Sequence, residues 1–261
     1  MSSYLEASLI CLVAFVAAGL TLFSGFGLGT LLMPVFALFW PVETAVALTA
    51  VVHLFNNLLK LALLGKHAQR TVVLQFGVPA IVEALLGAWV LRWLSNLEPV
   101  TRYHLFSREL SVVPLKVVIA VLLVVFVLLE ITPATGRFAF DKKYLPLGGV
   151  LSGFFGGLSG HQGALRSAFL IKCGLSKESF LGTGVVIACL VDLARLFMYG
   201  ATVPSVTAAG QPSLLLTVVV SASLGTILGS RFLAAVTLRA MQILVSVMLF
   251  GIAVGLAAGL I

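Results

Sequence analysis

Charged side chains are scarce in this sequence, which excludes a soluble globular protein. Only 10% of the 261 residues are Asp, Glu, Lys or Arg, against about 25% in a typical soluble domain. The net charge of +7 is spread over short loops and forms no clustered basic face, so we expect no nucleic-acid partner. The N-terminal stretch "MSSYLEASLICLVAF" lacks a basic segment and a small-residue cleavage site. We therefore expect it to be a membrane segment rather than a signal peptide.

The motifs of common enzyme classes are also missing. Cys11, Cys173 and Cys189 have no metal-ligand spacing and lie in or beside apolar segments, as small buried hydrophobic residues do. There is no Walker motif and no evident Ser-His-Asp set, and "GFGLG" lacks the strand–helix context of a dinucleotide loop. We therefore expect no enzyme activity, no metal and no cofactor.

Long apolar runs are what the sequence does have. Six runs near 20 residues extend from "LEASLICLVAFVAAGLTLF" to "MQILVSVMLFGIAVGLAAGLI". Each is long enough to cross about 30 Å of hydrocarbon as a helix. The alternating segments of about ten residues that build a membrane barrel are absent. The sequence predicts an all-α polytopic membrane protein with about 8–10 membrane segments.

The two halves of the chain repeat each other. The stretch "SGFGLGTLLMPV" aligns with "SGHQGALRSAFL" at an offset of 135, and the register holds over the following polar positions. The aligned pairs include Ser24 with Ser159, Glu43 with Glu178, Asn57 with Asp192, and Lys60 with Arg195. We interpret residues 1–135 and 136–261 as two transmembrane repeats that together form one membrane domain.

Each repeat is predicted to hold a Gly-rich break between two helical segments, followed by three long membrane helices. In the first repeat the predicted segments are 5–23, 28–40, 43–65, 71–94 and 112–132. In the second they are 144–158, 163–174, 177–200, 213–236 and 239–260. The segments around each break either cross the membrane separately or pair as a re-entrant hairpin.

Loop charges predict that the repeats are inverted. The loop "GKHAQR" carries Lys66 and Arg70, whereas its repeat partner "GATVPSVTAAGQPS" carries no charge. Equivalent loops of opposite charge bias belong on opposite sides of the membrane. We expect the loops holding Lys66 and Lys142 inside and both chain ends outside. The loop with Arg102 and Arg108 does not fit this rule, because it lies outside in the same scheme.

The two breaks are the predicted substrate site. Backbone groups freed in lipid cost on the order of several kcal/mol each, so broken helices persist where protein or a water-filled cavity satisfies them. Two equivalent breaks in inverted repeats are expected to meet near the midplane, with half-helix N-termini directed at an anion. The predicted substrate-binding residues are Gly27, Gly29, Thr30, His53, Asn56, Asn57, His161, Gln162, Gly163, Arg166, Ser167 and Thr183.

Alternative interpretations stay open for several of these positions. Glycines also serve close helix packing, which we favour for Gly87, Gly156, Gly157 and Gly229. His53 is either an ordinary core histidine or, with Asn56 and Asn57, part of a cavity wall. Arg166 either binds a sulfonate or carboxylate in a forked geometry, or snorkels or bonds a freed carbonyl.

Three further ionisable residues are candidates for coupling or gating. Asp192 and Arg195 are spaced i,i+3 and can neutralise each other, which favours a structural pair over a gate or proton relay. Glu83 has no basic residue one turn away, so it is either protonated or partnered by another helix. Its role in proton coupling is an open hypothesis.

Two long stretches carry a family resemblance. "GFGLGTLLMPVFALFWPVETAVALTAVVHLFNN" and "LSGFFGGLSGHQGALRSAFLIKCGLSKESFLGTG" resemble the sulfite exporter TauE/SafE family, also called the 4-toluene sulfonate uptake permeases. The resemblance covers nearly the whole chain and implies transport of sulfite, sulfoacetate or related organic anions across the bacterial inner membrane. The usual second break is richer in glycine, and His161 and Gln162 replace part of it here, so the substrate stays open.

The function expected from this sequence is secondary transport of a small anion by alternating access. An anion channel and a membrane scaffold without a solute are the alternatives. The expected partners are the anion and the lipid bilayer, and a homodimer is left open. The direction of transport and the coupling ion are not determined by the sequence.

Overall fold

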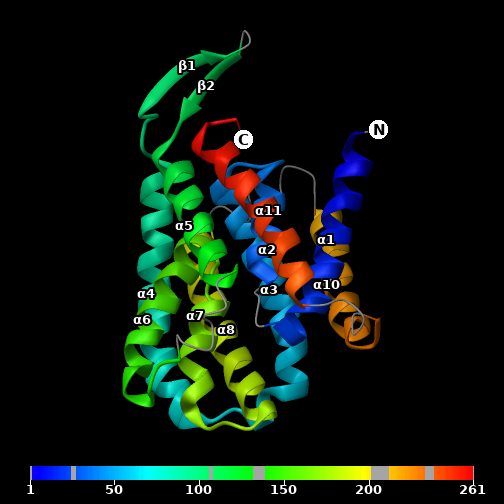
Figure 1. The fold of residues 1–261 in the computed structure, drawn as a ribbon, viewed down its shortest axis with the longest axis vertical. Helices are drawn as coiled ribbons and strands as arrows, with labels where there is room; N and C mark the ends of the chain where they lie inside the picture. Colours follow the sequence, from blue (N-terminus) through cyan, green and yellow to red (C-terminus); the bar gives the residue numbers. More distant parts are fainter. Residues whose placement is uncertain are drawn as a thin grey trace.

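The computed structural model describes residues 2–24, 28–105, 108–131, 139–200, 212–232 and 238–260, and most of these are helical (Figure 1). In the first half the helices are α1 (Ser2–Ser24), α2 (Leu28–Ala37), α3 (Val42–Leu64), α4 (Arg70–Ser95) and α5 (Pro114–Ile131). In the second half they are α6 (Leu145–Ser159), α7 (Gly163–Leu170), α8 (Lys177–Tyr199), α10 (Pro212–Phe232) and α11 (Leu238–Ala257). Short 3₁₀ turns occupy η1 (Gly65–His67), η3 (Lys142–Tyr144) and η4 (Ile171–Cys173).

The helices have the length and composition of a multi-pass membrane protein. In the described part of the chain, three helices are long and apolar enough to cross a membrane: Val42–His67, Arg70–Ser95 and Lys177–Tyr199. Shorter apolar helices span Leu5–Gly19, Leu28–Ala37, Pro114–Leu128, Pro212–Leu228 and Ser246–Ala257. Large apolar side chains such as Phe197 and Trp89 point outward, as expected of a surface that faces lipid. The prediction of a largely helical membrane protein is confirmed.

A β-hairpin corrects the prediction of an all-helical chain. Strands β1 (Thr101–Leu105) and β2 (Arg108–Val112) pair antiparallel and project beyond the ends of α4 and α5 (Figure 1). Thr101 and Tyr103 alternate with Arg102 and His104, the period-2 pattern of a strand. The Tyr103 hydroxyl donates to the carbonyl of Ala258, so the hairpin is attached to the C-terminal end of α11.

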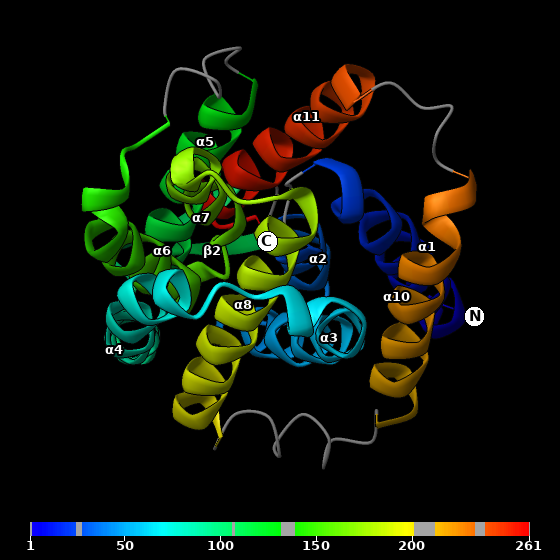
Figure 2. The same cartoon turned by 90° about the horizontal axis from the view of Figure 1, so that it is seen from below.

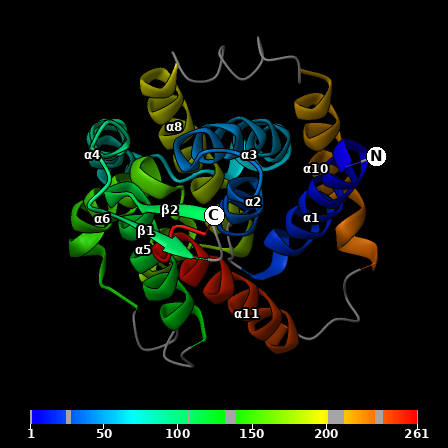
Figure 3. The same cartoon turned by 90° about the horizontal axis from the view of Figure 1, so that it is seen from above.

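Chain direction alternates through the bundle. In Figure 1, α1 descends from the N-terminus and α2 turns back upward, after which α3, α4 and α5 run down, up and down. Helix α6 rises, α7 turns back downward, and α8, α10 and α11 run up, down and up. Figures 2 and 3 place α1 and α10 side by side on one flank, α4 and α6 on the other, and α2 and α3 near the centre.

Glycines bring α4 and α6 into backbone contact. Gly149, Gly153 and Gly157 recur every fourth residue on α6, and a Cβ at any of them would lie 2.1–2.3 Å from a carbonyl oxygen of α4. A Cβ at Gly87 of α4 would lie 2.1 Å from the Phe154 carbonyl oxygen. Small residues at a membrane helix interface permit this approach. The packing role expected for Gly87 and Gly157 is confirmed, and the environment of Gly229 lies outside the described part.

Candidate functional site

The carboxylate of Asp192 is the centre of a buried polar cluster. Asp192 lies on α8 and is 0% exposed. From α3, the His53 Nδ1 lies 2.7 Å from Asp192 Oδ2, and the Asn57 Nδ2 donates to the same oxygen at 3.0 Å. His53 and Asn57 are four residues apart, so they lie on the same face of α3, one turn after the other. Of the two alternatives that the sequence left open for His53, a core histidine or part of a cavity wall, the structure shows a buried histidine whose ring contacts Asp192 of α8.

Arg195 neutralises this carboxylate from one turn further along α8. Its Nε and Nη2 donate to Asp192 Oδ1 at 3.1 and 2.8 Å, and its Nη1 donates to the Gly156 carbonyl at 3.3 Å. Both side chains are 0% exposed. A buried charge is tolerated where it is paired and its hydrogen bonds are made, and both conditions hold here. The expectation that Asp192 and Arg195 pair is confirmed.

The connection between α6 and α7 lies against this cluster. Gly160 ends α6 with φ +83°, a conformation that favours glycine. The Ser152 hydroxyl fixes the next turn by donating to the Gln162 carbonyl at 3.0 Å. A Cβ at Gly29, in the first turn of α2, would lie 3.1 Å from the Gly160 carbonyl oxygen. The start of α2 and the end of α6 are therefore in contact.

The Gln162 side chain links Arg166 to Asp192. Its Nε2 donates to Asp192 Oδ1 at 3.1 Å, and its Oε1 accepts from Arg166 Nη1 at 3.2 Å. It is the N-cap residue of α7 but makes no side-chain cap. The first amides of a helix have no partner within the helix, so the first turn of α7, from Gly163, offers free donors. Arg166 lies in the same turn and is half-buried.

His161 is buried beside this helix start. Its Nδ1 lies 3.0 Å from the Ser159 hydroxyl, and its ring stacks on Phe126 of α5 with centroids 5.0 Å apart. Its Nε2 has no hydrogen-bond partner among the described residues. A buried polar atom left without a partner costs about 1–3 kcal/mol. A ligand with a polar atom at this point would remove that cost.

The other predicted site residues lie at separate places. Thr30 is buried on α2, and the Thr183 hydroxyl accepts from the Gln69 amide at 2.9 Å, at the start of α4. Asn56 faces α10, where Thr226 donates to its Oδ1 at 2.5 Å. Glu83 and Ser167 are half-buried. Gly27 lies outside the described residues.

Sequence reasoning did not identify several residues of the cluster. Phe126 and Ser152 gave no signal, because an aromatic residue or a serine in an apolar run is common. The Tyr199 hydroxyl donates to the Gly157 carbonyl and so joins α8 to α6. Lys60 has a signal in the sequence, since it is a lysine within an apolar helix, one turn after Asn56, and the structure shows that it is buried.

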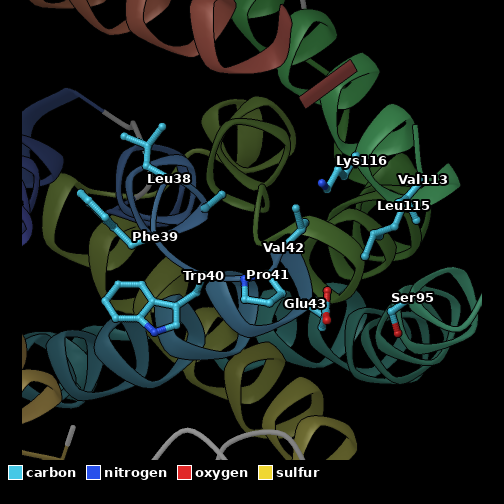
Figure 4. A pocket seen from close by; sticks show the side chains of 11 residues that line it. Leu38, Phe39, Trp40, Pro41, Val42, Glu43, Ser95, Val113, Leu115 and Lys116 are labelled. Carbon is cyan, nitrogen blue, oxygen red and sulfur yellow. The ribbon is translucent and has the colours of Figure 1, made fainter. Parts of the chain in front are cut away.

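A cavity of about 460 Å³ lies at the hairpin end of the bundle (Figure 4). It is lined by the α2–α3 turn, including Trp40 and Glu43, and by Ser95 and Lys116 at the adjoining ends of α4 and α5. The cavity does not reach the Asp192 cluster, because His53 follows Glu43 by about 15 Å along α3 at 1.5 Å per residue. It is an opening at one end of the helices and not the buried site itself.

Comparison with protein families identifies the chain. Residues 10–256 match the family described as Sulfite exporter TauE/SafE, which is a family of membrane transporters. Comparisons with curated proteins and with solved structures found no match. The family match spans both the α2–α3 and the α7–α8 segments that build the buried cluster. This chain belongs to the sulfite exporter TauE/SafE family.

Proposed function

We propose that the protein is a secondary transporter that holds a small sulfur-containing or organic anion at the start of α7. The observation that carries this proposal is the buried Nε2 of His161, beside the first turn of a short helix, for which the described part of the chain offers no hydrogen-bond partner. Family membership supports an anionic sulfur compound as the substrate class. The transport mechanism and the anion are the parts that we infer.

Three groups of different chemistry belong to the start of α7 and the residues just before it. The first-turn amides of α7 and the positive end of its dipole attract negative charge. The Arg166 guanidinium lies in the same turn and can form forked hydrogen bonds to a sulfonate or carboxylate. Gln162 holds Arg166 in place through its Oε1. We propose that His161, Gly163, Arg166 and Ser167 contact the anion, and that Asp192 and Arg195 form the scaffold beneath them.

The arrangement of helices supports two inverted repeats, 1–135 and 136–261. In these repeats α1 corresponds to α6, α3 to α8, and α4 to α10. The contact of α1 with α10 then corresponds to the contact of α6 with α4, and the contact of α3 with α10 corresponds to that of α8 with α4. Equivalent helices run in opposite directions in Figure 1. Asn57 and Asp192 occupy equivalent positions and are hydrogen-bonded, as expected of residues beside a two-fold axis. Inverted repeats that meet at a central site are typical of alternating access.

The alternatives are less well supported. A channel needs a continuous polar path, whereas Asp192 and the described residues that bond to it, His53, Asn57, Gln162 and Arg195, are all buried. In a scaffold protein, the His161 Nε2, which has no partner within the described ranges, would cost about 1–3 kcal/mol with no ligand to offset it. We place the protein in the bacterial inner membrane with both termini outside, from the loop charges and the family. A homodimer enters no step of this mechanism.

Titration calorimetry tests the site. The purified protein is first screened by thermal shift against sulfite, sulfoacetate, thiosulfate and small carboxylates, and the best anion is titrated. Arg166→Gln is expected to weaken its affinity about tenfold or more, because a charge-assisted hydrogen bond contributes about 1.5–3 kcal/mol and each 1.4 kcal/mol is a factor of ten. His161→Gln is expected to weaken it less, and the exposed control Lys142→Gln not at all. Wild-type affinity in folded Arg166→Gln would refute the site.

A further inference from the structure

A chain of hydrogen-bonded side chains connects α3 with the start of α7. The His53 Nδ1 contacts Asp192 Oδ2 at 2.7 Å, and Asp192 Oδ1 accepts from the Gln162 Nε2 at 3.1 Å. The Gln162 Oε1 in turn accepts from Arg166 Nη1 at 3.2 Å. The hydrogen bonds of such a chain polarise one another. A positive charge gained at His53 therefore acts on the first turn of α7, where Arg166 lies.

The hydrogen in the contact between His53 and Asp192 belongs to the imidazole. Asp192 is ionised, because its Oδ1 accepts from the Nε and the Nη2 of the buried Arg195. An ionised carboxylate can only accept, so the His53 Nδ1 carries the hydrogen that is directed at Oδ2. For the same reason this nitrogen does not accept from the Asn57 Nδ2, which lies 3.0 Å away. A further proton can then bind at the Nε2, and it turns the imidazole into a cation.

Of this pair, the imidazole reaches the accessible surface and the carboxylate does not. The His53 side chain is 8% exposed, whereas that of Asp192 is 0% exposed. Helix α2 packs against α3 without any titratable residue, and α10 faces it with the neutral Thr226. The charged side chains around the imidazole come from three helices: Asp192 and Arg195 from α8, Arg166 from α7, and Lys60 two turns further along α3. A proton on His53 therefore adds one positive charge to the site, whatever partners these groups have.

We propose that His53 binds the coupling proton, so that the transporter carries its anion together with a proton. This inference rests on the proposed function, since it takes the anion to bind at the start of α7. Without the anion, the imidazole is neutral and donates through its Nδ1 to Asp192. When the anion binds beside Arg166, its negative charge stabilises a proton from water on the His53 Nε2. The proton raises the affinity for the anion by the same factor, because the coupling of two bound ligands is reciprocal.

Titration calorimetry with thiosulfate measures this proton. Thiosulfate stays fully ionised between about pH 6 and pH 8, the range in which histidine titrates, so a proton that is taken up on binding belongs to the protein. Titrations in two buffers that differ in ionisation enthalpy and carry no sulfonate give the number of protons bound with each anion. In the wild type we expect net proton uptake within this range, and binding that is about fivefold or more weaker at pH 8 than at pH 6.

His53→Gln is the decisive variant, because its amide can still donate to Asp192 but does not titrate. We expect it to bind thiosulfate without proton uptake and with equal affinity at the two pH values. His161→Gln is expected to bind more weakly but to keep both the proton uptake and the pH dependence. His104→Gln, in which an exposed histidine of the hairpin is replaced, is expected to match the wild type.

The outcomes separate this inference from the proposed function. Thiosulfate binding without proton uptake by the wild type overturns the inference and leaves the anion site standing, as does unchanged uptake in folded His53→Gln. Loss of the proton uptake in His161→Gln, with its retention in His53→Gln, assigns the proton to the other histidine and also overturns the inference.

Transport by the wild type in proteoliposomes decides the matter if His53→Gln does not fold. An acidic outside and a neutral inside are expected to drive accumulation of thiosulfate, and the same rate with and without this pH gradient overturns the inference. A wild type that does not bind thiosulfate overturns it as well. If that protein responds to no other anion in the thermal-shift screen, the proposed function is rejected together with this inference.

Discussion

Replacing Asp192 by asparagine is expected to destabilise the protein strongly, although the side chain changes little in size. The substitution removes the charge that Arg195 neutralises, and Arg195 is 0% exposed. Among the described residues, the Gly156 carbonyl, at 3.3 Å, is then the remaining hydrogen-bond partner of the guanidinium. The amide also places a donor where His53, Asn57 or Gln162 now donates, because one carboxylate oxygen becomes an NH₂ group.

The size of the effect follows from burial. Breaking a buried ion pair by removing one partner costs about 3–5 kcal/mol, because the other charge stays buried without compensation. For a chain of this length, each kcal/mol lowers the unfolding midpoint by about 2–4 °C, so we expect a loss of about 10 °C. The exposed pair of Asp141 and Lys172, 3.9 Å apart, provides the comparison. Asp141→Asn is expected to cost less than about 1 kcal/mol.

Thermal unfolding of the detergent-solubilised protein, followed by intrinsic fluorescence, measures these differences. The double variant Asp192→Asn/Arg195→Gln is expected to recover more than half of the loss, because no unpaired charge remains buried. If Asp192→Asn and Asp141→Asn lower the midpoint equally, the reasoning from burial is wrong. If the double variant is less stable than Asp192→Asn, the loss comes from the hydrogen bonds and not from the unpaired charge.

Two further predictions concern the helix contacts and the topology. Gly157→Ala is expected to destabilise the protein by about 1–3 kcal/mol, because its Cβ would lie 2.1 Å from the Ala84 carbonyl oxygen. A Cβ at Gly251 would meet nothing within 4 Å, so Gly251→Ala is expected to be neutral or stabilising in the same unfolding assay. Equal midpoints for the two variants contradict the packing argument. In a protein without native cysteines, Gly65→Cys and Thr207→Cys (the latter outside the described residues) are expected to react with an impermeant thiol reagent from opposite sides of the membrane. Reaction of both from one side contradicts the inverted repeats.

The long helices were predictable because the ends of the apolar runs coincide with residues that begin or end helices. Helix α3 was expected over 43–65 and spans Val42–Leu64, with Pro41 as its N-cap residue, and α8 ends one residue before Gly200. Helix α7 is shorter than the predicted 163–174, since η4 and Gly174 with φ +66° complete that segment. Apolar composition does not distinguish a turn of α-helix from a turn of 3₁₀-helix. The hairpin was missed because a short two-stranded ribbon has little apolar periodicity.

The site was predictable as a set of polar positions but not as a network. The pairing of Asp192 with Arg195 follows from their i,i+3 spacing on one helix. The contact of Asp192 with His53 joins residues 139 positions apart and depends on how α3 packs against α8. The stacking of His161 on Phe126 has no polar signature in the sequence. Local spacing therefore gives the pairs within a helix, and only packing gives those between helices.

In the inverted repeats that we propose, the hydrogen bond between Asn57 and Asp192 limits how the two halves can diverge. Two residues that occupy equivalent positions and touch, at 3.0 Å here, cannot both be ionised carboxylates in a buried place, because like charges at that distance raise each other's cost of ionisation. A chain assembled from two copies of the second half would set aspartate against aspartate at this point. The contact is stable only if one of the two residues is uncharged, so neither half can replace the other at this position.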